Sequence, residues 1–145
     1  VLVKPDRTIL EKIKHLPFDY FQIYDCSPQE IKEIKQKYNK KIISVITVSN
    51  QEDVKKYKAF EDVADILLFD SKGYQNTQSF DHNLLNNVNS SKPIMVAGDI
   101  KTDDLINFKD KHFLIDASGN LESEKGVKDI NKIDKFLNTV HNINS

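Results

Sequence analysis

The sequence predicts a parallel α/β fold, and two patterns along its 145 residues support that prediction. Short apolar runs of the kind that form buried strands alternate, six times, with segments whose apolar residues recur at helical spacing. Several of these runs stop at a carboxylate or a glycine, where parallel α/β folds place their functional side chains. Strands connected by helices form a parallel sheet that helices cover. Six such units fit either an open doubly wound sheet or six of the eight units of a (β/α)8 barrel.

Three strands are expected in the first half of the chain, and β-branched or aromatic residues dominate the two longer ones. They span residues 1–3, 20–24 and 41–48. A helix is expected over residues 8–15, and a second should begin after Ser27, because the stretch Ser-Pro-Gln-Glu from Ser27 to Glu30 is typical of a capping box. Asn50 is expected to cap a third helix.

The second half repeats the pattern with shorter strands, and a polar segment at residues 71–79 is expected to form a loop. The expected strands span residues 65–69, 94–97 and 113–116. A short helix is expected around Leu84, another from a Thr102 cap, and a longer one from Asp129. The apolar residues that define these helices are Leu84, Leu85 and Val88, then Leu105, Ile106 and Phe108, and finally Ile130, Ile133, Phe136, Leu137 and Val140.

The composition indicates a single domain, residues 1–145, that binds neither nucleic acid nor membranes. Charged residues make up 30% of the chain but its net charge is −1, and no apolar run approaches the ~20 residues that cross a bilayer. The one cysteine, Cys26, cannot form an internal disulfide, which fits a cytoplasmic protein. The histidines show no ligand spacing and the chain has no Gly-x-Gly-x-x-Gly or Gly-Lys-Ser motif, so neither a metal nor a cofactor is expected.

The strand ends resemble, in order and spacing, those of the phosphoribosylanthranilate isomerase family, whose members are (β/α)8 barrels of tryptophan biosynthesis. The segments that carry the resemblance are Leu67-Leu68-Phe69-Asp70, Ser79-Phe80-Asp81, Val96-Ala97-Gly98, Asp116-Ala117-Ser118, and Glu122 followed by Gly126-Val127-Lys128-Asp129. The resemblance covers nearly the whole chain and places Val1 in the third strand of the barrel. It implies that the chain is a partial barrel, from the third strand to the last helix, and that the first two βα units of the family's layout are absent from it.

The residues in these motifs differ from those usual in the family at several positions. The family usually has Gln-Leu-His-Gly at its fourth strand, where this chain has Gln22-Ile23-Tyr24-Asp25. Its seventh strand usually ends in Gly-Gly, here Gly98-Asp99, and its eighth reads Asp-Val-Ser-Ser-Gly, here Asp116-Ala117-Ser118-Gly119-Asn120. These departures leave two alternatives open, namely a non-catalytic phosphate-binding remnant of a barrel and a different enzyme of the phosphate-binding barrel group.

The resemblance implies an Amadori rearrangement, in which a ribosylamine ring opens and a carbon-bound proton then leaves. Such a reaction needs an acid and a base but no metal or redox cofactor. Asp70 matches the family's general acid, and partial burial would favour its protonated form; the alternative is an Asp that only begins a loop. The family's base is a cysteine on its first strand, so the chain as it stands is expected to lack the base and to be inactive alone. Cys26 is expected to pack rather than to react.

The resemblance also implies a small phosphorylated substrate, whereas it predicts no oligomeric state. Backbone amides after the last two barrel strands form a usual phosphate site. The residues expected there are Gly98, Asp99, Ser118, Gly119 and Asn120. The side chain of Asp99 is expected to point away from the phosphate, because two negative charges repel each other. Asp116 either contacts the substrate or ends its strand by bonding loop amides.

Overall fold

Six strands form one parallel sheet in the computed structural model, which describes residues 1–76 and 78–145. They are β1 (Leu2–Val3), β2 (Tyr20–Tyr24), β3 (Lys41–Val48), β4 (Ile66–Ser71), β5 (Ile94–Val96) and β6 (Leu114–Ile115). Their order in the sheet is their order along the chain. An open doubly wound sheet reverses its strand order partway, so that alternative is excluded, and the order is the one that a barrel requires.

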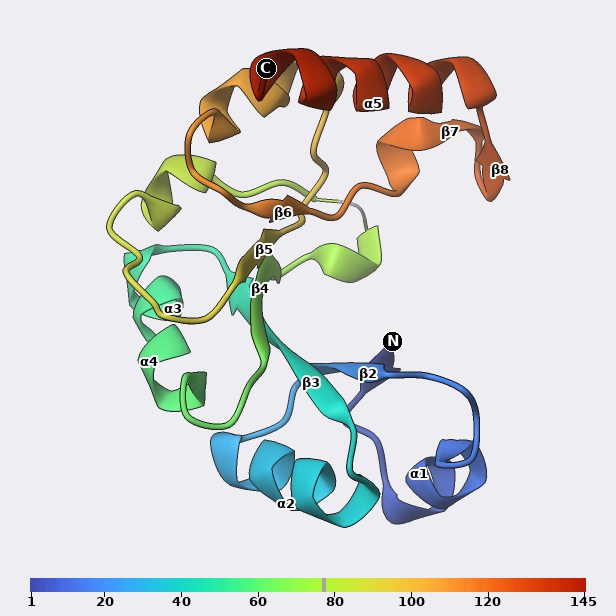
Figure 1. Cartoon of the computed structure of the whole chain (residues 1–145), viewed down its shortest axis with the longest axis vertical. Coiled ribbons are helices and arrows are strands. Elements are labelled where there is room, and N and C mark those ends of the chain that lie inside the picture. The colour runs from blue at the N-terminus through green and yellow to red at the C-terminus, as the bar shows by residue number, and fades with distance from the viewer. Residues whose placement is uncertain (77) are drawn as a thin grey trace.

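Figure 1 shows that the short helical segment directly after β4 lies on the inner side of the curved sheet, whereas most of the helices follow one another around its outside. The helical segments are α1 (Arg7–Ile13), α2 (Pro28–Tyr38), α3 (Gln51–Lys55), α4 (Tyr57–Phe60), η1 (Tyr74–Asn76), η2 (His82–Leu85), η3 (Thr102–Phe108), η4 (Gly119–Leu121) and α5 (Ile130–Ile143). No helix in the described parts of the chain is long and apolar enough to span a bilayer.

Three of the predicted helix caps are confirmed. Glu30 N donates to Ser27 Oγ at 3.2 Å and Ser27 N donates to Glu30 Oε2 at 2.7 Å, which completes the capping box of α2. Asp53 N donates to Asn50 Oδ1 at 3.0 Å at the start of α3, and Lys132 N donates to Asp129 Oδ1 at 3.1 Å at the start of α5. Such caps depend on residues three apart, which is why the sequence alone reveals them.

The expected cap at Thr102 is wrong. Lys101 occupies that position instead, because its backbone N donates to Asp104 Oδ2 at 2.8 Å. The segment after it is the 3-10 helix η3, and the short helix expected around Leu84 is also a 3-10 helix, η2. Only one face of η3 is buried, so the apolar residue Ile106 is 59% exposed. Tighter 3-10 turns are common where a helical segment is this short.

The sequence did not predict the short 3-10 helices η1, which lies within the expected loop at residues 71–79, and η4, nor did it predict a hairpin. Strands β7 (Glu122–Glu124) and β8 (Val127–Lys128) form a separate antiparallel hairpin between β6 and α5. Gly126 lies in its turn with a φ of +83°, a conformation that glycine adopts at little cost. The strand Glu122-Ser123-Glu124 has no apolar residue, so the usual signal of a strand is missing.

Alternation along the strands separates two sets of buried side chains. Leu67 and Phe69 of β4 pack in the largest cluster, which also contains residues of α3, α4, η3 and α5 and so lies between the sheet and the helices. Leu68 packs in a different cluster, with Tyr24, Val45 and Ala97. Because successive side chains of a strand point to opposite faces, Asp70 lies on the same face as Leu68, opposite the helices. The functional groups at the strand ends therefore face the inside of the curve.

Candidate functional site

A cavity of about 560 Å³ lies at the carboxyl ends of the strands. The residues predicted for the site all line it, namely Asp70, Gly98, Asp99, Asp116, Ser118, Gly119 and Asn120. They come from the ends of β4, β5 and β6, which the parallel sheet brings to one edge. Gln22, Tyr24, Glu122 and Lys125 also line the cavity and were not predicted.

Asp70 is buried at the centre of this set, with 6% of its surface exposed. Both of its carboxyl oxygens accept hydrogen bonds: Oδ2 from the hydroxyl of Tyr24 at 2.7 Å, and Oδ1 from the backbone N of Ser71 at 2.7 Å. The bond from Ser71 is the local contact expected of an Asp that begins a loop, whereas the bond from Tyr24 comes from a distant strand. The carboxyl is thus held in one orientation within the cavity.

Asp116 is a second, partly buried carboxyl in the same cavity. Its backbone N donates to the carbonyl of Val96 at 2.9 Å, which extends the pairing of β5 with β6 by one residue. Burial and the nearby negative charge of Asp70 raise the pKa of Asp116 above its usual value. Two interacting carboxyls therefore share one cavity, an arrangement in which one of them tends to hold a proton.

The turn after β5 brings backbone very close to other groups. Gly98 has a φ of +94°, and a Cβ added there would lie 3.1 Å from Cδ1 of Phe80. Asp99 has a φ of +52°, and its Oδ1 accepts a hydrogen bond from Asn120 Nδ2 at 2.6 Å. Asn120 Nδ2 also donates to the carbonyl of Ile100 at 3.2 Å. The side-chain amide of Asn120 thus links the loop after β5 to the loop after β6.

The loop after β6 is held by a lysine of the hairpin. Lys128 Nζ donates to the carbonyl and the hydroxyl of Ser118, at 2.9 and 3.1 Å, and forms an ion pair of 2.8 Å with Glu122. Carboxylates outnumber cations among the residues that line the cavity, where Lys125 is the positively charged side chain. An anion bound here would therefore depend on backbone amides rather than on the overall charge.

Cys26 lies outside this cavity, among the described residues that pack against the smaller apolar cluster around Leu10, Ile23 and Ile31. Burial, together with the carboxylates of Glu30 and Asp25, raises the pKa of its thiol. A thiol with a raised pKa is a weak nucleophile and base near neutral pH. The expectation that Cys26 packs against apolar neighbours is confirmed.

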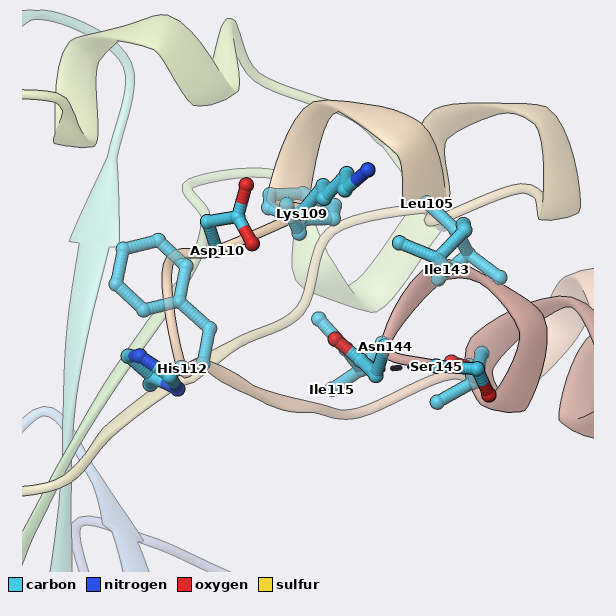
Figure 2. Close-up of a pocket in the computed structure, with 11 residues that line it drawn as sticks. Leu105, Lys109, Asp110, His112, Ile115, Ile143, Asn144 and Ser145 are labelled. Carbon is cyan, nitrogen blue, oxygen red and sulfur yellow. Dashed lines mark hydrogen bonds between the residues drawn. The ribbon is translucent and has the colours of Figure 1, made fainter.

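A second cavity of about 490 Å³ lies between η3, the segment before β6 and the end of α5. Figure 2 shows Lys109, Asp110 and His112 on one side of it and Asn144 and Ser145 at the end of α5 on the other. It contains none of the predicted site residues. Over the described ranges, no three His, Cys, Asp or Glu side chains come together as metal ligands in either place.

Comparison with known proteins identifies similar chains. The family model described as N-(5'phosphoribosyl)anthranilate (PRA) isomerase matches residues 3–139. A curated N-(5'-phosphoribosyl)anthranilate isomerase of Rhizobium johnstonii is 31% identical over 156 residues, covering 100% of this chain and 70% of the relative. The enzyme of the same name from Campylobacter jejuni is 38% identical over 133 residues, covering 89% of this chain and 64% of the relative.

Solved structures share the fold. Phosphoribosyl anthranilate isomerase of Thermotoga maritima superposes with a TM-score of 0.78 at 20% identity, over 97% of this chain and 72% of that one. A phosphoribosyl anthranilate isomerase in complex with reduced 1-(o-carboxyphenylamino)-1-deoxyribulose 5-phosphate has a TM-score of 0.76 at 17% identity, over 97% and 70% of the two chains. This chain therefore spans about seven tenths of the length of those structures.

Proposed function

The chain belongs to the N-(5'-phosphoribosyl)anthranilate isomerase family, and from this premise we propose that the cavity at its strand ends is the active site for that reaction. Family membership makes the activity the isomerisation of phosphoribosylanthranilate in tryptophan biosynthesis. One observation carries the placement of the site: Asp70, Asp116 and the backbone after β5 and β6 line the same cavity. The carboxyls that could transfer protons and the backbone that could bind an anion therefore line the same cavity.

We assign Asp70 the role of general acid. Its proton would pass to the ring oxygen of the ribosylamine as the bond between that oxygen and C1 breaks, and the carboxylate left behind would keep its hydrogen bonds from Tyr24 and Ser71. The second proton, on the adjacent carbon, needs a base. Cys26 does not line the cavity, so it is not that base.

We assign the phosphate to the backbone of Gly98-Asp99 and of Ser118-Gly119-Asn120. The turn at Gly98 admits close approach because no side chain projects from it, and η4 begins at Gly119, directly after Ser118. The carboxylate of Asp99 accepts a hydrogen bond from the side chain of Asn120, and the ammonium group of Lys101 lies 4.0 Å from its other oxygen. The substrate contact proposed for Asp116 would come from its partly buried carboxyl, which lines the same cavity.

The sequential strand order supports a further structural proposal, that these six βα units correspond to the last six of an eight-unit barrel. β1 and β6 each pair with one strand only among those described, as the two sides of an incomplete barrel would. Membership of this family also supports a proposed cytoplasmic location. The proposed binding partner is a small phosphorylated substrate.

The test is an isomerase assay on the protein as its gene encodes it, following the loss of anthranilate-type fluorescence. Asp70→Asn should lower kcat by a factor on the order of 10² to 10⁴, the usual contribution of a positioned acid. Asp81→Asn is the matched control, because Asp81 caps η2 outside the cavity and Asn caps equally well. Full activity in Asp70→Asn would refute the assigned role. A folded wild-type protein that binds the reduced product analogue without turnover would instead favour a non-catalytic barrel.

A further inference from the structure

A buried hydrogen bond joins two strands that do not pair with each other. Tyr24 is the last residue of β2 and Asp70 lies near the end of β4, with β3 between them. The phenol crosses the inner face of β3, where Val45 packs against it, and its hydroxyl donates to Asp70 Oδ2 at 2.7 Å. Tyr24 is 5% exposed and Asp70 is 6% exposed, so water competes little for this bond.

We infer that Tyr24 is a positioning residue for proton transfer at Asp70, and that it holds the carboxyl in place and makes its proton easier to release. This inference rests on the proposed role of Asp70 as the general acid. The backbone N of Ser71 fixes Oδ1, and the hydroxyl of Tyr24 fixes Oδ2, so the plane of the carboxyl is defined from two directions.

The two donors differ in what they do when Asp70 gains or loses its proton. A backbone N–H can only donate, and its direction is set by the strand. A phenol hydroxyl rotates, so it donates to the ionised carboxylate and accepts from, or turns away from, the protonated acid. Both hydrogen bonds strengthen as the proton leaves, which is the property that assists a general acid, and Tyr24 is the donor whose hydroxyl can also turn to suit the protonated form.

The charged groups near Asp70 differ in whether they are paired with a lysine. Asp116 lies near enough for the two carboxyls to repel each other, whereas Asp99 and Glu122, which line the same cavity, form ion pairs with Lys101 and Lys128. Burial and the charge of Asp70 raise the pKa of Tyr24 above its usual value, so its phenol stays a neutral donor through the working pH range.

The decisive experiment follows the carboxyl of Asp70 directly, by NMR of protein with ¹³C-labelled aspartate, with the resonance assigned by its loss in Asp70→Asn. Tyr24→Phe should move the titration midpoint of Asp70 up by about one pH unit, a tenfold gain in proton affinity. The alkaline limb of the kcat profile should move in the same direction while KM stays nearly constant. Tyr57→Phe is the matched control, because Tyr57 is also 5% exposed and bonds Asn89 outside the cavity.

An unchanged midpoint in a natively folded Tyr24→Phe protein would overturn the inference. If that variant fails to fold, the reciprocal measurement decides: Asp70→Asn should lower the pH at which one tyrosine ionises, read from tyrosinate absorbance, and no change would count against the coupling. These titrations need no turnover. A shifted midpoint in a protein without isomerase activity would therefore reject the proposed function, whereas activity that depends on Asp70 with an unmoved midpoint would reject the role of Tyr24 alone.

Discussion

Replacing Gly98 with alanine should destabilise the fold far more than the same replacement at Gly126, although both glycines have a positive φ. The φ of Gly98 is +94° and that of Gly126 is +83°, and such angles cost an L-residue roughly 1–2 kcal/mol. At Gly126 nothing lies within 4 Å of the added methyl group, so that cost should stand alone. Both variants therefore carry the backbone cost of a positive φ, and they differ in the atoms that the added methyl group meets.

At Gly98 the added methyl group would also meet Phe80, at 3.1 Å from Cδ1 and 3.2 Å from Cε1, and the backbone N of Ser71 at 3.4 Å. The ring of Phe80 cannot retreat freely, because it packs edge-on against His82 with ring centres 4.6 Å apart. Overpacking of this kind costs about 1–3 kcal/mol. The total for Gly98→Ala is therefore roughly 2–5 kcal/mol, a large part of the about 5–15 kcal/mol that stabilises an ordinary domain.

Urea denaturation of the wild type and both variants measures the two costs. Gly98→Ala should exceed Gly126→Ala by about 1–3 kcal/mol, and the excess should shrink when Phe80 is replaced by leucine, because the two sites are then no longer in contact. If the two variants lose equal amounts of unfolding free energy, or if the excess persists without the ring of Phe80, the contact between the added methyl group and Phe80 does not destabilise the fold.

The remaining predictions concern two carboxyls with opposite pKa shifts. Burial alone would raise the pKa of Asp53, but its hydrogen bonds with Lys56 and Lys72, each 2.8 Å long, lower it well below its usual value. Asp53→Asn should therefore cost about 1–3 kcal/mol at neutral pH, and the deficit should begin to shrink as the pH falls below about 4, where the carboxyl of the unfolded chain takes up a proton while that of the folded protein stays ionised; urea denaturation at pH 7 and pH 3 checks this. Asp116 has a raised pKa, because of its burial and the charge of Asp70, so its ionised form destabilises the fold. Asp116→Asn should be more stable than the wild type at pH 7 and lose that advantage near pH 3, and a constant difference across this range would contradict the shift.

Local signals in the sequence predicted the regular elements well. The strands β2 and β3 have the predicted limits, and the caps at Ser27, Asn50 and Asp129 form as expected. These features depend on residues close together in the chain, whose preferences the sequence displays directly. The cap at Lys101 was missed because Asp104 bonds the backbone N of Lys101, and any residue type at the cap position supplies that group.

Contacts between distant residues could not be predicted in the same way. The sequence placed Asp70 at a strand end, but not the bond from Tyr24, 46 residues away, because that bond depends on the register of three strands and on the space beside Val45. The link between Asn120 and Asp99 likewise depends on how two loops meet. The hairpin at Gly126 went unrecognised because β7 has no apolar residue and β8 is only two residues long.

The sequential strand order also has a consequence for how the protein folds. Each strand pairs with the strand nearest to it along the chain, so the sheet can grow by adding one unit at a time, from either direction or during synthesis. Such growth needs few long loops to close. The bond from Tyr24 to Asp70 is different, since it requires β2, β3 and β4 to be in register together. Formation of that bond therefore reports that three consecutive strands have reached their native register, which pairing of any two of them alone does not.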